Sequence, residues 1–176
     1  MKSRSGGLFV GRLTIEAGAG ILLEALDLYP GAGVDVVGTG PEAARFAAHP
    51  HIRLLGRLAT EELRKRMLGA AYLVMPSLSY DAEPQALVQA FATGLPVIAS
   101  RLSTLAELVE PGRNGLLFEP GSARELARRL AWAEAFPEKM RQMGECAQAD
   151  YQARFIADWS WQRLYGERRR QARMQR

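Results

Sequence analysis

The sequence is poor in residues that build several common kinds of site. It has one cysteine, Cys146, among 176 residues, so no internal disulfide can form and nothing indicates an oxidising compartment. No histidine lies near Cys146 in the sequence, which favours a small helical residue over a nucleophile. The two histidines, His49 and His51, lie ahead of an expected strand and are interpreted as surface residues. No set of His, Cys and carboxylates has the spacing of metal ligands, so no metal centre is predicted.

Long apolar runs are missing as well. No stretch approaches the roughly 20 apolar residues that cross a bilayer. The start of the chain also lacks the charged, apolar and small-residue succession of a secretion signal. Nearly half of the 176 residues are hydrophobic, enough for one domain with a real core and too few for two. These features predict a single domain over residues 1–176, located in the cytoplasm.

Excess charge of one sign is confined to the C-terminal end. The formal net charge is +4, and the basic tail, 167–176, holds five Arg and one Glu, so 5 − 1 accounts for all of it. The remainder is balanced, which argues against nucleic-acid binding and favours a solvated helix end. Contact of the tail with anionic lipid headgroups stays open, at about 1 kcal/mol for each basic residue. On that alternative the domain is peripheral to the inner face of a membrane.

Short apolar runs alternate with longer amphipathic stretches. Six runs are apolar at nearly every position, as is typical of strands buried on both faces: Leu8–Gly11, Val34–Gly38, Ile52–Gly56, Tyr72–Pro76, Pro96–Ser100 and Gly115–Phe118. Helical patterns cover 18–29, 40–48, 60–69, 83–94, 103–109 and 122–134, and Ser122 with Glu125 has the spacing of a capping box. The alternation predicts an α/β fold: a doubly wound, mainly parallel six-stranded sheet with helices on both faces.

Beyond the sheet core, about 8–134, only helical patterns follow, which predicts a helical C-terminal extension over about 137–172. The two patterns lie at about 137–151 and 158–172. Pro137 suits the first turn of the former. Trp159 and Trp161 give the latter apolar area that has to pack, either on this sheet or on a neighbour.

The residues that follow the strands carry the candidate chemistry, because an open parallel sheet binds ligands at the carboxyl ends of its strands. Gly11-Arg12 follows the first run, Gly56-Arg57 the third, 77–85 the fourth and Ser100-Arg101 the fifth. Three arginines, several glycines and a helix N-terminus therefore meet at one edge. This environment suits a phosphate-bearing ligand.

The segment "GTGPEA", 38–43, matches the glycine pattern of dinucleotide-binding proteins. That fingerprint normally follows the first strand and has an acidic residue about 20 positions later. Here the next strand ends in Gly56-Arg57, with no carboxylate. A tight strand-to-helix turn is the favoured interpretation. An NADP-dependent oxidoreductase, with the arginine on the 2′-phosphate, stays open as a weaker alternative.

The most specific passage is "MPSLSYDAEPQALVQAFATGLPVIAS", from Met75 to Ser100. It resembles the donor-binding segment of the group 1 (family 4) retaining glycosyltransferases of the GT-B fold. The segments "LFVGRLTIEAGAGILLEAL", "VVGTGPE", "IRLLGRL" and "AELVEPGRNGLLFEPGS" follow the order and spacing of that family. The resemblance covers essentially the whole chain and implies one Rossmann-like half of the GT-B fold.

In that family, one domain binds a nucleotide-diphosphate sugar and the other binds the acceptor. The chain resembles the donor-binding, C-terminal domain only. The resemblance therefore implies hexosyl transfer with retention, without metal or further cofactor, and an acceptor-binding N-terminal domain or separate chain as partner. Without that partner we expect the chain to be inactive. A non-catalytic nucleotide-binding or structural module of the same fold is the alternative.

The resemblance assigns the diphosphate contacts as follows. Arg12, beside Gly11, matches the family arginine that contacts the donor diphosphate. Five positions later, where the family usually has a second cation, this sequence has Ala17. The backbone N–H groups of Gln85 and Ala86 would face the diphosphate from a helix start.

The sugar and nucleoside contacts are also implied by the resemblance. The paired glutamates of the family fall on Asp81 and Gln89, which would contact the donor sugar and the ribose. Asp81 and Arg12 would be the catalytic residues. Arg57 matches the position that contacts the nucleobase. Ser103-Thr104 stands where the family has Gly-Gly ahead of a glutamate, here Glu107, whose role as a site or surface residue stays open.

Overall fold

The structure is a computed structural model that describes residues 4–80 and 85–156. Its strands lie within one residue of the predicted runs at each end, so the predicted strands are confirmed. They are β1 (Gly7–Val10), β2 (Val34–Val37), β3 (Ile52–Gly56), β4 (Tyr72–Met75), β5 (Val97–Ser100) and β6 (Gly115–Phe118).

The helices alternate with the strands and then continue alone, as predicted. They are α1 (Ala19–Leu28), α2 (Ala43–Ala48), α3 (Thr60–Gly69), α4 (Gln85–Ala92), α5 (Ser103–Leu108), α6 (Ala123–Ala135) and α7 (Pro137–Asp150), followed by one π-helical turn, η1 (Tyr151–Ile156). Pro137 is in the first turn of α7, as expected. The capping box is only half formed: Ser122 Oγ accepts from Glu125 N–H at 3.2 Å, but the Glu125 carboxylate accepts from Glu119 N–H at 2.8 Å.

All six strands are parallel, in the order β3-β2-β1-β4-β5-β6. This arrangement confirms the doubly wound sheet. The chain moves outward from β1 to β3, returns to β4 beside β1, and continues outward in the other direction. The switch point therefore lies between β1 and β4, where such sheets bind ligands at their carboxyl edge.

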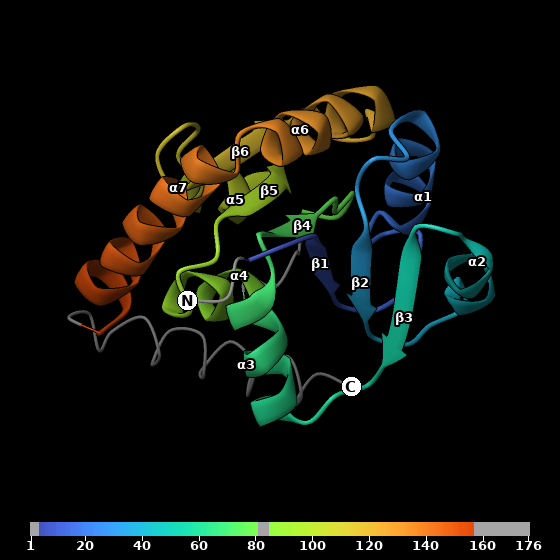
Figure 1. Cartoon of the computed structure of the whole chain (residues 1–176), viewed down its shortest axis with the longest axis horizontal. Coiled ribbons are helices and arrows are strands. Elements are labelled where there is room, and N and C mark those ends of the chain that lie inside the picture. The colour runs from blue at the N-terminus through green and yellow to red at the C-terminus, as the bar shows by residue number, and fades with distance from the viewer. Residues whose placement is uncertain (1–3, 81–84, 157–176) are drawn as a thin grey trace.

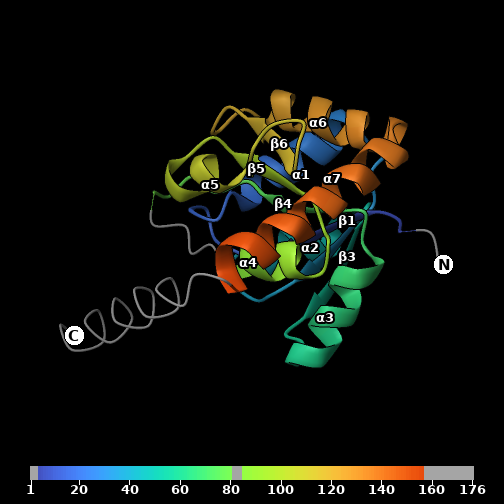
Figure 2. The same cartoon turned by 90° about the vertical axis from the view of Figure 1, so that its left-hand side faces the viewer.

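Two apolar layers cover the sheet (Figures 1 and 2). On one face, α1 and α6 pack on residues such as Phe9, while Leu8, its neighbour in β1, belongs to the layer under α3 and α4. Successive residues of β1 thus enter opposite cores, because strand side chains alternate between faces. This double burial explains why the strand sequences are continuously apolar.

The C-terminal extension packs on the sheet half through α7, which contacts α4, α6 and β6. Gly144 allows a close approach, since a Cβ there would lie 2.3 Å from the Gly94 carbonyl oxygen. The predicted helix 158–172 and the basic tail, 167–176, lie outside the described residues. Within residues 4–80 and 85–156, no helix combines the length and apolarity needed to span a membrane.

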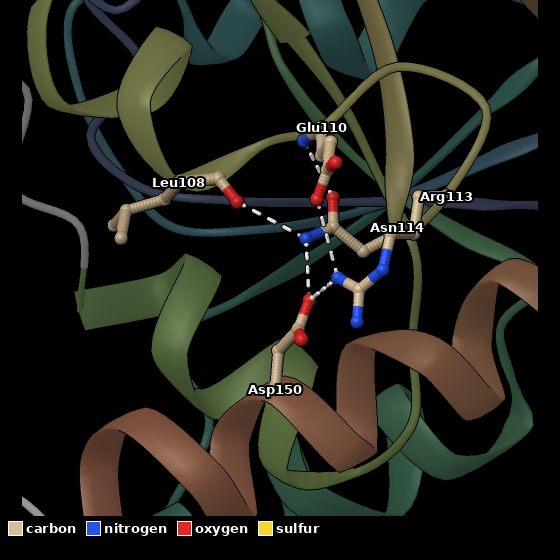
Figure 3. Close-up of polar contacts among 5 residues, drawn as sticks. All are labelled: Leu108, Glu110, Arg113, Asn114 and Asp150. Atoms are coloured by element: carbon tan, nitrogen blue, oxygen red, sulfur yellow. Dashed lines mark hydrogen bonds and ion pairs between the residues drawn. The ribbon is translucent and has the colours of Figure 1, made fainter.

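A buried polar cluster fixes the end of α7 to the turn before β6 (Figure 3). Asp150 is 5% exposed, and its Oδ2 accepts from Arg113 Nη1 at 2.5 Å and from Asn114 Nδ2 at 2.8 Å. The Asn114 amide also donates to Leu108 O at 3.1 Å and accepts from Glu110 N–H at 2.8 Å. Asn114, itself fully buried, thus has its amide oxygen and nitrogen both hydrogen-bonded.

Candidate functional site

The loop between β1 and α1, residues 11–18, is bonded to the turn after β2. Leu13 N–H donates to Thr39 O at 3.0 Å. Two glycines make this approach possible. A Cβ at Gly38 would lie 1.8 Å from a backbone oxygen of the β1–α1 loop, and one at Gly40 would lie 2.5 Å from the Leu13 carbonyl oxygen. The glycines of "GTGPEA" therefore accommodate the backbone of the chain itself.

This packing favours the turn interpretation over a nicotinamide site. In a dinucleotide fingerprint, the second glycine lets the pyrophosphate approach the backbone. Here the space beside Gly40 holds the Leu13 carbonyl group. The motif also follows β2 rather than β1. The same packing moves the start of α2 from the predicted residue 40 to Ala43.

On its other side, the β1–α1 loop is bonded to the residues that follow β4. Leu78 N–H donates to Glu16 O at 2.8 Å. Gly18 has φ +80°, and a Cβ there would lie 1.8 Å from the Pro76 carbonyl oxygen. Ser77 is buried beside this contact. The two loops that flank the switch point therefore form one bonded edge.

The structure places the predicted diphosphate residues at this edge. Gly11 and Arg12 directly follow β1, and both are exposed. Gln85 opens α4 and is exposed, and Ala86 is half-buried beside it. Gln89 lies four residues further on, so it shares the face of Gln85 on the helix and is half-buried.

The other predicted site residues lie further from the switch point or outside the described residues. Arg57 follows β3 at the same edge, with β2 and β1 lying between β3 and β4, and is exposed. Asp81 lies outside the described residues. Glu107 is exposed on α5. The roles of all these residues stay predictions.

Arg12 has a carboxylate neighbour in its own loop. The pKa of Glu16 lies below its ordinary value, mainly because its own backbone N–H and then the Thr14 hydroxyl donate to it. Burial opposes this shift weakly, and the positive charge of Arg12 adds to it. Among the described residues, Arg12 makes no hydrogen bond or close ion pair, so its guanidinium is available to an anion.

Two contacts that shape the edge were not predicted, although Ser77 falls within the predicted segment 77–85. Gly18 packs on Pro76, and Ser77 Oγ donates to Glu16 O at 3.5 Å, so both contacts join segments about 60 residues apart. Nothing in the local sequence signals them beyond a glycine ahead of a helical pattern. The interpretation of His49 as a surface residue was wrong: its side chain is 8% exposed, and Nε2 lies 3.2 Å from Asp27 Oδ1. Within the described residues, no group of three or more possible ligands forms a metal site.

Ser103 has a left-handed backbone conformation, φ +41°, at the start of α5. An L-residue in this region costs roughly 1–2 kcal/mol, whereas glycine adopts it freely. We expect Ser103→Gly to raise the free energy of unfolding by about 1 kcal/mol in urea denaturation. Ser103→Ala retains the Cβ and should give no gain. Equal stability of the glycine and alanine variants would show that the conformation is not strained.

The comparisons with known proteins agree with this architecture. The chain is 30% identical over 167 residues to an uncharacterized glycosyltransferase of Methanocaldococcus jannaschii, covering 89% of this chain and 44% of that protein. It is 31% identical over 147 residues to the amylovoran biosynthesis glycosyltransferase AmsK of Erwinia amylovora, covering 73% of this chain and 36% of that one. The chain thus spans less than half the length of these relatives.

Solved structures show the same fold. HepE of Anabaena in complex with UDP superimposes with a TM-score of 0.76 at 26% identity, over 87% of this chain and 45% of HepE. HepE in complex with UDP-glucose gives a TM-score of 0.75 at 25% identity, over 86% and 45%. Residues 7–150 match the sequence model of the glycosyl transferases group 1. The chain therefore belongs to the group 1 glycosyltransferases and forms one Rossmann-like half of their fold.

Proposed function

We propose that this domain binds the nucleotide-diphosphate sugar of a glycosyl transfer reaction at the carboxyl edge of β1 and β4. The observation that carries the proposal is the switch point, where the exposed Arg12 lies in the β1–α1 loop, this loop is bonded to the residues after β4, and α4 follows β4. The similar protein HepE has been solved with UDP and with UDP-glucose, which supports the same ligand class for this chain.

The chemistry proposed for this edge is stabilisation of the diphosphate leaving group. Arg12 would donate charge-assisted hydrogen bonds to phosphate oxygens. The N–H groups of Gln85 and Ala86 lie at the positive, N-terminal end of α4, which adds favourable electrostatics for an anion. Negative charge grows on the diphosphate as the bond between the anomeric carbon and the phosphate oxygen breaks, so donors fixed beforehand lower the barrier. This chemistry uses no metal and no cofactor besides the donor substrate.

Selectivity for the rest of the donor would come from neighbouring side chains. We propose that Asp81 accepts from the sugar hydroxyls, that Gln89 bonds the ribose, and that Arg57 contacts the base. Gly11 would let the donor approach the backbone after β1. The transfer is proposed to retain the anomeric configuration.

A partner domain is part of the proposal. Since the chain spans 44% and 36% of the two relatives named above, the acceptor would bind to another domain or chain. This domain alone would then bind donor but transfer no sugar. A non-catalytic module of the same fold would either bind no donor or bind a nucleotide without taking part in sugar transfer.

Calorimetric titration with UDP, GDP and ADP tests donor binding. We expect at least one of the three to bind with a dissociation constant between roughly 1 µM and 1 mM, or about −8 to −4 kcal/mol. NADPH is the matched control and should give no heat. No heat with any of the three nucleotides would favour the alternative that the domain is a structural module. Binding of NADPH alone would favour the oxidoreductase alternative.

A further inference from the structure

A second arginine, Arg101, lies level with Arg12 at the carboxyl edge. Val74 of β4 pairs with Phe9 of β1 on one side and with Ile98 of β5 on the other. Arg12 and Arg101 each lie three residues beyond this row. Adjacent strands are about 4.8 Å apart, so β1 and β5 lie about 10 Å apart across β4. A diphosphate seated over the end of β4 would have one arginine on each side.

The backbone around Arg101 is fixed while its side chain is exposed. Its N–H donates to Phe118 O at 2.9 Å, and Leu102 N–H donates to Ser100 O at 2.8 Å, which closes a tight turn. Ser100 and Leu102 are both buried, at 0% and 9% exposed. The arginine thus projects into solvent from the apex of an anchored turn, a placement with little backbone entropy to lose on binding.

The net charge of the β1–α1 loop does not by itself balance the charge of a diphosphate, so a second cation would be favourable. The β1–α1 loop holds one cation and one carboxylate, Arg12 and Glu16, so it is formally neutral. A nucleotide-diphosphate sugar carries two negative charges. Within the described residues, Arg101 makes no ion pair with a carboxylate. Arg57 follows β3, which is two strands beyond β1 on the side away from β4, so Arg57 is less well placed for the diphosphate.

We propose that Arg101 binds the donor diphosphate together with Arg12, one arginine from each side of β4. The inference rests on the proposed function. It makes the leaving group, rather than the sugar or the base, the ligand of Arg101. Two arginines on opposite sides would orient the diphosphate as well as neutralise it.

The test compares binding of a nucleotide and of its nucleoside, for example UDP and uridine, by calorimetry. Arg101→Ala should weaken nucleotide binding about tenfold, or about 1.4 kcal/mol, and change nucleoside binding less than twofold. Arg101→Glu should weaken nucleotide binding further. Arg128→Ala, which removes an exposed arginine from α6, is the matched control and should change neither. The difference should shrink as salt is raised from 0.05 to about 0.5 M, because screening weakens exposed ion pairs.

The outcomes separate this inference from the proposed function. A wild-type chain that binds none of UDP, GDP and ADP would refute the proposed function itself. Wild-type binding that Arg101→Ala leaves unchanged, or that Arg101→Glu weakens no more than Arg101→Ala does, would refute the role of Arg101 alone. Equal losses for nucleotide and nucleoside would do the same.

Discussion

Gly18→Ala is expected to lower the free energy of unfolding by about 3 kcal/mol, while Gly20→Ala, two residues later, raises it by about 0.5–1 kcal/mol. Gly18 has φ +80°, and its new Cβ would lie 1.8 Å from the Pro76 carbonyl oxygen, so either the β1–α1 loop or the backbone after β4 must move. The left-handed backbone conformation and the steric clash together place Gly18→Ala among the strongly destabilising substitutions. Gly20 is in α1 with no atom within 4 Å of its Cβ position, and alanine is the better helix former.

Urea denaturation of the two variants measures this difference directly. Because Gly18 holds the loop that carries Arg12, Gly18→Ala should also weaken nucleotide binding, and Gly20→Ala should leave it within about twofold. Similar stabilities for the two variants would mean that the loops are not in the close contact described here.

Asp150→Ala is expected to cost about 3 kcal/mol of unfolding free energy. Removing one partner of a buried ion pair typically costs about 3–5 kcal/mol, and the 42% exposure of the Arg113 side chain lowers that figure. The buried Asn114 would also lose a hydrogen-bond acceptor. Glu110→Ala is the matched control: it removes an exposed carboxylate, 3.3 Å from the same arginine, and should cost under about 0.5 kcal/mol.

The same cluster makes stability depend on pH in acid. Burial acts to raise the pKa of Asp150, but hydrogen bonds from Arg113 and Asn114 and the arginine charge outweigh it, so the pKa lies below its usual value. A depressed carboxyl pKa contributes stability that is complete above the unfolded value of about 3.9 and is lost as pH falls toward the folded value. The stability difference between wild type and Asp150→Asn should therefore be constant from about pH 7 to 5 and narrow below about pH 4. A difference that stayed constant to pH 2 would contradict the ion pair.

The sheet could be predicted from sequence because each strand is buried on both faces. Leu8 and Phe9 enter opposite cores, so β1 is apolar at successive positions. Short apolar runs that alternate with helical patterns have no other simple interpretation than buried strands. The helix boundaries were less predictable where a distant segment decides them. The start of α2 depends on contact between Gly40 and Leu13, which lie 27 residues apart.

The candidate site was predictable only where it follows the order of the strands. Arg12 and Gln85 could be assigned to one edge because strand ends of a parallel sheet converge there. The contacts of Gly18 with Pro76 and of His49 with Asp27 join residues 58 and 22 positions apart. Such contacts leave no periodic signal in the chain, and the contact of Gly18 with Pro76 joins the loop that carries Arg12 to the residues after β4.

The most direct test of the proposed diphosphate site is the effect of Arg12→Ala on two affinities. One is the affinity for UDP, or for whichever of the three nucleotides binds, and the other is the affinity for the matching nucleoside. A charge-assisted hydrogen bond is worth roughly 1.5–3 kcal/mol, so the nucleotide should lose at least about tenfold in affinity while the nucleoside changes less than twofold. Equal losses for both ligands, or no loss for either, would mean that no phosphate group rests against Arg12 at this edge of the sheet.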